Sequence, residues 1–370
     1  MNRERSNRQI SFDKVIGHRE DRLKKGQKPM IGIDIGSNSL KMVQMKKNSR
    51  IHRWGMERVP EGLINQGRIE VSSQLAEIIK KTAHRNKIKG NQCSLCLSGS
   101  DLIVRELKLP EMNEDQIMDN IKHEITSFLP LNHEEYSIDY KVLEYIPSKV
   151  GMPGKLRLMV AAVPNKIVQN YINTLKKANL KVVYVDVVPN IAGKLVKWMM
   201  LSQSKTVDNS NIGIIDFGAN TTNIILLKEG NYFIHKSIAS GGDYLTSHIS
   251  EKLKIDYMEA EAFKRKANFF ENNFQNNTCE YIKNYFDYLI TDIERTIEFY
   301  KNRNNQKGLD HIYIMGGGSL LKGLSGYMKE HLSVGVSLLS DTLHQSKKGN
   351  INTEKVAAFS QAIGATIREE

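Results

Sequence analysis

Apolar and polar residues alternate in two short segments that lie far apart in the chain. In the first, isoleucines alternate with Gly32 and Asp34 over 30–35, which predicts a strand. A Gly-Ser-Asn-Ser turn then leads to a second strand over 40–45. The segment 211–227 repeats this order of strand, polar turn and strand. We therefore expect two lobes of related topology, each opening with a hairpin whose tip faces the other lobe.

The rest of the pattern indicates a mixture of helices and strands. Between the hairpins, Ile117, Ile121 and Ile125 recur at helical spacing. The expected elements of this block are an extended segment over 101–109, a helix over 113–128, strands over 136–145 and 156–163, a helix over 165–178 and a strand over 181–187. The expected elements after the second hairpin are a mostly helical stretch over 243–303, a strand over 311–315, a glycine run with another helix, and a closing helix over 354–368.

These elements predict an α/β chain with several parts. The expected parts are a basic flexible tail over 1–29, a first lobe over 30–109 completed by 182–208 and 354–370, an inserted subdomain over 110–181, a second lobe over 209–242 and 308–353, and a helical subdomain over 243–307. Since the two hairpin tips face each other, the cleft between the lobes is the expected binding site.

Composition is that of a soluble globular protein, with 40% hydrophobic and 25% charged residues in 370. Three cysteines are too few for a disulfide framework and no signal peptide precedes the first strand, so we expect a cytoplasmic protein. Cys93 and Cys96 form a CxxC in an alternating run, and without a second pair we interpret them as strand residues rather than zinc ligands. No stretch approaches the roughly 20 apolar residues of a membrane span.

Charge narrows the possible partners only a little. The formal net charge of +12 gives attraction to anionic lipid, nucleic acid or an acidic protein face and does not by itself choose among them. We do not expect nucleic acid as a partner, because the basic residues are dispersed and no known nucleic-acid-binding motif accompanies them. The tail over 1–29 is either a contact for an anionic membrane surface or partner, or a solubilising extension with no specific role.

The two hairpins carry the chemistry that a nucleoside triphosphate requires. Its phosphates need converging backbone N–H groups, and its Mg²⁺ needs a carboxylate, often reached through water. Asp-x-Gly alone is a common turn, but its duplication favours a site, with Asp34 and Asp216 as the metal ligands through water. The candidate binding residues are Asp34, Gly36, Ser37, Asn38, Ser39 and Lys41 in the first hairpin and Asp216, Gly218, Asn220, Thr221 and Thr222 in the second.

A glycine run follows the strand over 311–315. Gly316, Gly317 and Gly318 would let a flat base or ribose lie directly on the backbone, whereas the alternative is a flexible loop between strand and helix. The order of two Asp-x-Gly hairpins and this glycine run resembles the phosphate 1, phosphate 2 and adenosine motifs of the actin-like ATPase superfamily. The resemblance covers 30–370 and implies a two-lobed actin-like fold with duplicated core domains that binds ATP or ADP with Mg²⁺.

Two further features add to this resemblance. Gly241-Gly242-Asp243 followed by Ala260-Glu261-Ala262-Phe263-Lys264 is similar to segments of bacterial actins, which implies that Gly242, Glu261 and Lys264 line the nucleoside pocket. The alternative for Glu261 and Lys264 is an ion pair on a solvated helix face. Gly193 and Gly364 lie in segments that resemble the interlobe connections of the superfamily, where they would permit close helix approach.

Within the superfamily the chain resembles the PilM family of type IV pilus assembly proteins. The segments that carry this resemblance are 31–43, 61–69, 104–110 and 123–131. The resemblance implies an FtsA-like inserted subdomain and a groove near Phe128, Leu129 and Pro130 that receives the cytoplasmic N-terminal peptide of a PilN-like inner-membrane protein. It also implies an adaptor at the inner face of the plasma membrane, working with other pilus assembly components.

Alternatives to an adaptor remain open. One alternative is an FtsA-like polymerising actin homologue on the membrane, although the membrane-targeting helix that ends that family is not expected after Arg368. The other alternative is a small-molecule phosphotransferase of the same superfold. No catalytic residue can be assigned, because Asp186, Asn190 and Asn220 could equally be capping or turn residues. We expect at most slow ATP hydrolysis, and self-association is possible.

Overall fold

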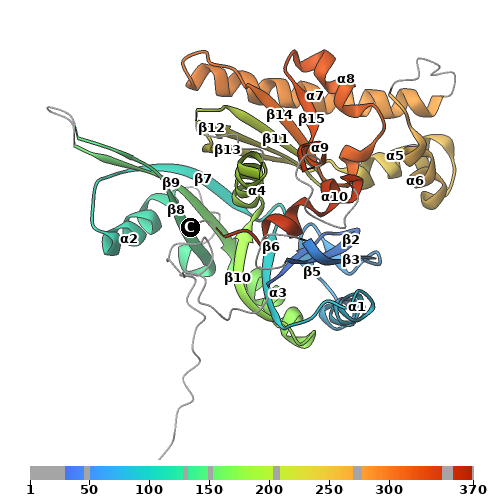
Figure 1. Cartoon of the computed structure of the whole chain (residues 1–370), viewed down its shortest axis with the longest axis horizontal. Coiled ribbons are helices and arrows are strands. Elements are labelled where there is room, and N and C mark those ends of the chain that lie inside the picture. The colour runs from blue at the N-terminus through green and yellow to red at the C-terminus, as the bar shows by residue number, and fades with distance from the viewer. Residues whose placement is uncertain are drawn as a thin grey trace, which may run out of the picture.

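The computed structural model describes residues 30–45, 51–127, 132–148, 153–202, 209–269, 277–343 and 353–368. Two five-stranded sheets with helices packed around them form two lobes, and a three-stranded sheet extends to one side (Figure 1). The predicted tail over 1–29 and the predicted groove residues Phe128, Leu129 and Pro130 lie outside the described residues. Within the described part, no helix combines the length and apolar character needed to cross a bilayer.

The first lobe is built on a sheet of strand order β10-β6-β1-β2-β3. Its strands are β1 (Ile31–Ile35), β2 (Ser39–Met45), β3 (Ile51–Arg58), β6 (Gln92–Leu97) and β10 (Lys181–Val187). β1, β2 and β3 are antiparallel neighbours, whereas β6 and β10 run parallel to β1. The short hairpin β4 (Ile64–Asn65) and β5 (Arg68–Ile69) and the helices α1 (Ser72–Arg85) and α3 (Asn165–Lys177) complete this lobe.

The second lobe repeats the same topology. Its sheet has the order β13-β12-β11-β14-β15, again with three antiparallel strands followed by two parallel ones. Its strands are β11 (Ile212–Phe217), β12 (Thr222–Lys228), β13 (Asn231–Ile238), β14 (His311–Met315) and β15 (Val336–Leu338). Asp34 pairs with Lys41 across the first hairpin, and Asp216 pairs with Asn223 at the corresponding place in the second. The predicted duplication of the core is therefore confirmed.

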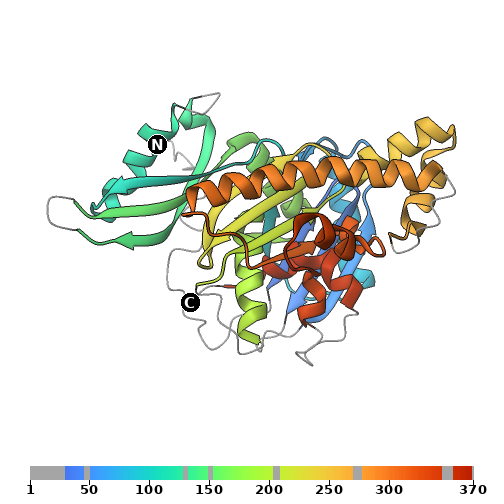
Figure 2. The ribbon, with the colours of Figure 1, turned by 90° about the horizontal axis from the view of Figure 1, so that it is seen from above.

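Helices cover the outer side of the second sheet and extend beyond its end (Figure 2). They are α5 (Gly242–Leu253), α6 (Tyr257–Lys266), α7 (Asn277–Arg303) and α8 (Leu324–Leu332). α6 begins where Asp256 accepts hydrogen bonds from the backbone N–H groups of Met258 and Glu259, as an N-cap residue does. α7 buries Phe286, Leu289 and other apolar side chains of one face against the sheet.

A small sheet of order β7-β9-β8 forms the side subdomain. Its elements are β7 (Ile103–Pro110), α2 (Glu114–Ile125), the 3₁₀ turn η1 (His133–Glu135), β8 (Tyr136–Ile146) and β9 (Lys155–Pro164). α2 covers one face of the sheet with Ile117, Ile121 and Ile125. The expected block over 110–181 differs from this unit at both ends, because β7 pairs with β9 and α3 packs against α1 of the first lobe. The local sequence pattern predicts where a strand lies but not which distant strand it pairs with.

Two helices lie between the two large sheets and join the lobes. α4 (Val188–Ser202) and α10 (Thr353–Gly364), with the short α9 (Leu339–Leu343), share one apolar cluster with both sheets. A Cβ on Gly364 would lie 2.6 Å from a side-chain carbon of Ile191, so glycine is required where α10 meets α4. Gly193 has ordinary space around it, its hypothetical Cβ lying 3.8 Å from Leu227, and close approach does not depend on it.

Candidate nucleotide-binding cleft

A cleft of about 860 Å³ opens between the lobes. Both hairpins line it, together with the start of α5, one face of α6, the glycine run and α10. All residues predicted to bind the cofactor lie on its wall: Asp34, Gly36, Ser37, Asn38, Ser39, Lys41, Asp216, Gly218, Asn220, Thr221, Thr222, Gly242, Glu261, Lys264, Gly316, Gly317 and Gly318. Their contact with a nucleotide stays a prediction.

The two hairpin turns have the same local structure. The backbone N–H of Gly36 donates to the carbonyl of Ser39 over 3.1 Å, and that of Gly218 donates to the carbonyl of Thr221 over 3.0 Å. A Cβ on Gly218 would lie only 2.8 Å from the same Thr221 oxygen, so the turn tolerates no larger residue there. Both turns therefore bring the backbone against the cleft without an intervening side chain at the bend.

Asp34 is a buried carboxylate on the cleft floor with a fixed cationic partner. Lys41 Nζ donates to Asp34 Oδ2 over 2.9 Å, and both side chains are largely shielded from solvent. Burial acts to lower the pKa of Lys41, but the charge of Asp34 and its hydrogen bond outweigh burial and raise the pKa overall. Lys41 therefore stays an ammonium at neutral pH and keeps one positive charge at the base of the cleft.

Asp216 is equally buried, and its hydrogen-bond partners are neutral. Asn223 Nδ2 donates to Asp216 Oδ2 over 3.3 Å, and Gln361 Nε2 donates to the same oxygen. Burial, followed by the nearby charge of Asp34, raises the pKa of Asp216 to about 6. His235 Nε2 lies 3.1 Å from Asn223 Oδ1, and because burial lowers the pKa of His235 to about 4, its neutral ring donates there.

The carboxylates of Asp34 and Asp216 suit a metal cation that binds only together with a phosphate-bearing ligand. Among the described residues, no group of three or more His, Cys, Asp or Glu side chains could hold a metal by itself. Mg²⁺ in proteins is usually held by one or two carboxylates, several waters and the substrate's phosphates. Asp34 and Asp216, one from each lobe, fit that donor set. Cys93 and Cys96 are buried residues of β6, as predicted for strand residues.

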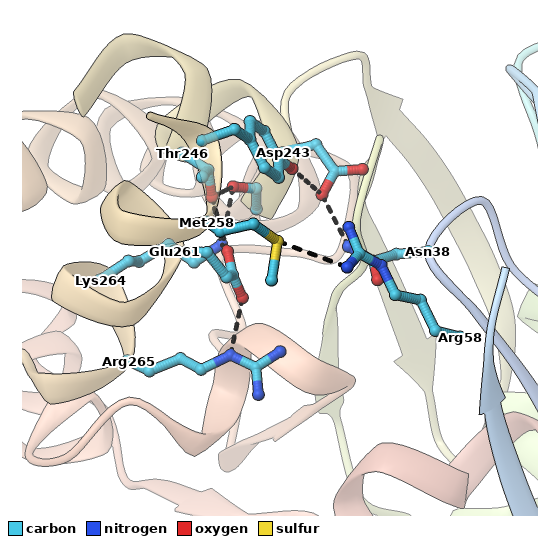
Figure 3. Close-up of polar contacts among 10 residues, drawn as sticks. Asn38, Arg58, Asp243, Thr246, Met258, Glu261, Lys264 and Arg265 are labelled. Atoms are coloured by element: carbon cyan, nitrogen blue, oxygen red, sulfur yellow. Dashed lines mark hydrogen bonds and ion pairs between the residues drawn. The ribbon is translucent and has the colours of Figure 1, made fainter. Parts of the chain in front are cut away.

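A partly buried ion-pair network closes the second-lobe wall (Figure 3). Lys264 Nζ donates to the Gly242 carbonyl over 2.9 Å, to Thr246 Oγ1 over 2.6 Å and to Glu261 Oε2. These contacts use all three donors of the ammonium group. Arg265 Nε donates to Glu261 Oε1 over 2.8 Å from a largely exposed side chain. Glu261 and Lys264 thus both line the cleft and form an ion pair, although the pair is shielded rather than solvated.

Side-chain hydrogen bonds across the cleft join the lobes directly. Asn38 Nδ2 donates to Asp243 Oδ1 over 3.1 Å, and Asn220 Nδ2 donates to Ser37 Oγ over 2.9 Å. At the mouth, Arg58 Nη1 lies 3.3 Å from the sulfur of Met258, a weak acceptor (Figure 3).

Asp243 also holds α5 and α6 together. Its Oδ1 accepts a hydrogen bond from Tyr257 Oη over 3.0 Å. Sequence reasoning did not single out Arg58, Asp243 or Met258 as cleft residues. Only Asp243 had a signal, as part of the Gly-Gly-Asp segment.

The glycine run departs from the predicted strand–glycine–helix order. Gly316 has φ of +85° and is followed by one 3₁₀ turn, η2 (Gly317–Leu320), while α8 starts only at Leu324. Gly323, also at positive φ, separates the turn from the helix. A Cβ added to Gly317 would meet nothing within 4 Å, so this peptide presents bare backbone to the cleft.

Asp186 and Asn190 do not line the cleft. Asp186 Oδ1 accepts hydrogen bonds from the backbone N–H of Val187 and from Asn190 Nδ2, and its other oxygen pairs with Lys194. These contacts tie the end of β10 to the first turns of α4. Gln361 and Asn223 are the floor residues that sequence reasoning missed.

Comparisons with known proteins agree with this architecture. The sequence model of one family, described as type IV pilus assembly protein PilM, matches residues 32–368. Among solved structures, the chain is similar to one titled PilM-PilN type IV pilus biogenesis complex, with 22% identity, a TM-score of 0.78 and coverage of 92% of this chain and 98% of that one.

More distant similarities extend to other actin-like proteins. The structure of MreB 5 of Spiroplasma citri bound to AMPPNP has 13% identity, a TM-score of 0.50 and coverage of 91% and 97%. Cell division protein FtsA of Buchnera aphidicola subsp. Baizongia pistaciae is 23% identical over 384 residues, covering 90% of this chain and 88% of that protein. The fold is that of the actin-like ATPases.

Proposed function

Since the chain belongs to the type IV pilus assembly protein PilM family, we propose that it is an ATP-binding adaptor in the assembly of a type IV pilus or a related competence or secretion system. The observation that carries this proposal is the cleft, in which two equivalent hairpins bring one buried carboxylate from each lobe to a common floor. The nucleotide-bound MreB structure supports such a use of the fold.

In this proposal each part of the wall has one task. The N–H groups of Gly36 and Gly218 donate within their turns, so the other backbone N–H groups of the two hairpin tips would hold the phosphates, and Lys41 would supply a positive charge beside them. Mg²⁺, bound through water to Asp34 and Asp216, would neutralise phosphate charge. The open backbone at Gly317 receives the base.

The proposed partner is the cytoplasmic N-terminal peptide of a PilN-like inner-membrane protein. A similar solved structure is titled as a PilM-PilN complex, which supports this choice. The peptide would bind near Phe128, Leu129 and Pro130, which follow α2 in the sequence. The adaptor would then work on the cytoplasmic face of the plasma membrane, with slow or no ATP hydrolysis. The second candidate function is that of an FtsA-like, polymerising, membrane-associated homologue, and the similarity to FtsA supports it.

Isothermal titration tests both halves of the proposal. We expect Mg-ATP to bind the wild-type chain, and a synthetic PilN-like N-terminal peptide to bind with an affinity that changes when nucleotide is present. The double variant Asp34→Ala and Asp216→Ala should lose Mg-ATP binding while its circular dichroism spectrum stays unchanged. Unchanged affinity in that variant would contradict the site assignment. Nucleotide binding without peptide binding, together with nucleotide-dependent filaments, would favour the FtsA-like alternative.

A further inference from the structure

Helix α10 is built into the first lobe. A Cβ on Gly32 of β1 would lie 1.9 Å from the Ala362 carbonyl oxygen, so helix and strand are in direct backbone contact. Two residues further along the helix, Gly364 lies against Ile191 of α4, where an added Cβ would lie 2.6 Å from a side-chain carbon. Side chains of α10, including the fully buried Phe359, pack in the interlobe cluster. Contacts this close let α10 move only together with β1.

From that position α10 also packs against second-lobe residues of the same apolar cluster and makes two hydrogen bonds to that lobe. The Ala357 carbonyl accepts from the backbone N–H of Gly316 over 3.0 Å, and Gln361 Nε2 donates to Asp216 Oδ2. The other end of the same amide, Gln361 Oε1, accepts from the Cys96 thiol of the first sheet over 3.6 Å. The Gln361 side chain therefore spans from β6 of one lobe to the candidate metal carboxylate of the other.

One oxygen of Asp216 thus has two amide donors of different origin. Asn223 lies on the neighbouring strand of the same sheet, and its contact persists however the lobes are arranged. Gln361 belongs to the opposite lobe, and its contact exists only while the lobes keep the arrangement seen here. Outer partners that orient a ligating carboxylate typically contribute about 10- to 100-fold to metal affinity.

We propose that Gln361 is a positioning residue that makes the metal–nucleotide affinity of Asp216 depend on closure of the two lobes. The inference rests on the nucleotide-binding function proposed above. When the lobes separate, Asp216 loses one of its two orienting donors and the metal site weakens. Linkage requires the reverse effect as well, so bound metal–nucleotide stabilises the closed arrangement through Gln361.

Two matched variants test this inference. Gln361→Met keeps the length of the side chain and removes the interlobe donor, whereas Asn223→Leu removes the donor within the lobe. Lys81 on α1 and Glu330 on α8 are exposed and suit cysteine replacement for spin labels that report the interlobe distance. Cys279→Ser removes one native thiol, and Cys93 and Cys96 are buried. Distances are measured with and without Mg-ADP, and affinities by titration.

We expect both variants to bind Mg-ADP about 10- to 100-fold more weakly than wild type. Only Gln361→Met should broaden the interlobe distance distribution of the nucleotide-free protein, and only Gln361→Met should fail to narrow it when Mg-ADP is added. A Gln361→Met variant that matches wild type in both readouts overturns the inference, as does equal broadening by Asn223→Leu. If wild type binds no Mg-ADP, the proposed nucleotide function itself fails, a result distinct from a failure confined to Gln361.

Discussion

Replacing Gly316 with alanine is expected to destabilise the protein strongly. Gly316 has φ of +85° and ψ of 173°, a combination that non-glycine residues adopt only at a cost of about 1–3 kcal/mol. The added Cβ would also lie 2.5 Å from both Asp216 Oδ1 and the Phe217 carbonyl oxygen. Relieving such an overlap in a packed region costs about 1–3 kcal/mol more. The sum, about 2–6 kcal/mol, is a large part of the roughly 5–15 kcal/mol that stabilises a typical fold.

The neighbouring residue provides the control. Gly317 has no positive φ, and a Cβ there would meet nothing within 4 Å. Gly317→Ala should therefore leave the free energy of unfolding within about 1 kcal/mol of wild type. Its new methyl group projects toward the cleft, so we expect it to weaken nucleotide binding without weakening the fold.

Urea unfolding followed by circular dichroism measures both variants, and titration with Mg-ATP measures the ligand effect. A Gly316→Ala variant as stable as wild type would refute the argument from backbone conformation and overlap. Equal destabilisation by Gly317→Ala would refute it too, because the loss would then come from the glycine run as a whole. A normal ATP affinity in Gly317→Ala would indicate that the base lies elsewhere.

Two further predictions concern titratable side chains. Lys264→Met should lower the free energy of unfolding by about 1–3 kcal/mol because Glu261 loses a shielded partner. Arg265→Met removes a largely exposed partner of the same Glu261 and should lower it by less than about 1 kcal/mol. Thermal unfolding of both variants measures the difference. The pKa of His235 is lowered to about 4, so the folded protein binds this proton less tightly than the unfolded chain. The neutral His235 ring therefore contributes to the free energy of unfolding fully above about pH 6.5, and this contribution is lost as pH falls toward 4. We expect the free energy of unfolding to fall by about 2 kcal/mol between pH 7 and pH 5 from this group. Urea titrations across that range should give a flatter profile for His235→Gln, and identical slopes would contradict the assignment of a buried neutral ring.

The cleft hairpins were predictable because each is a local unit. Strand alternation and a turn with fixed glycine and aspartate positions lie within about 15 residues, and duplication of the pattern indicated two facing lobes. The resemblance supplied Gly242, Glu261 and Lys264, which no local rule would have selected.

Other features depend on contacts between distant parts of the chain. The assignment of β7 to the small sheet follows from its pairing with β9, about 50 residues later. Gln361 offered one weak signal, a long polar side chain in a helix otherwise made of small and apolar residues, but nothing local indicated its contact with Asp216. Asn223 and His235 likewise read as ordinary strand residues.

The position of α10 also sets the order in which the molecule can be completed during synthesis. Its side chains fill the cluster that joins the two sheets, yet it is the last helix of the described chain to leave the ribosome. At about 5–20 residues per second, the ribosome needs roughly 7–30 s to travel from β11 to α10. Throughout that interval the cluster between the two sheets lacks the side chains that α10 contributes. Ribosome-bound chains arrested before 353 should therefore be more sensitive to protease than the finished chain.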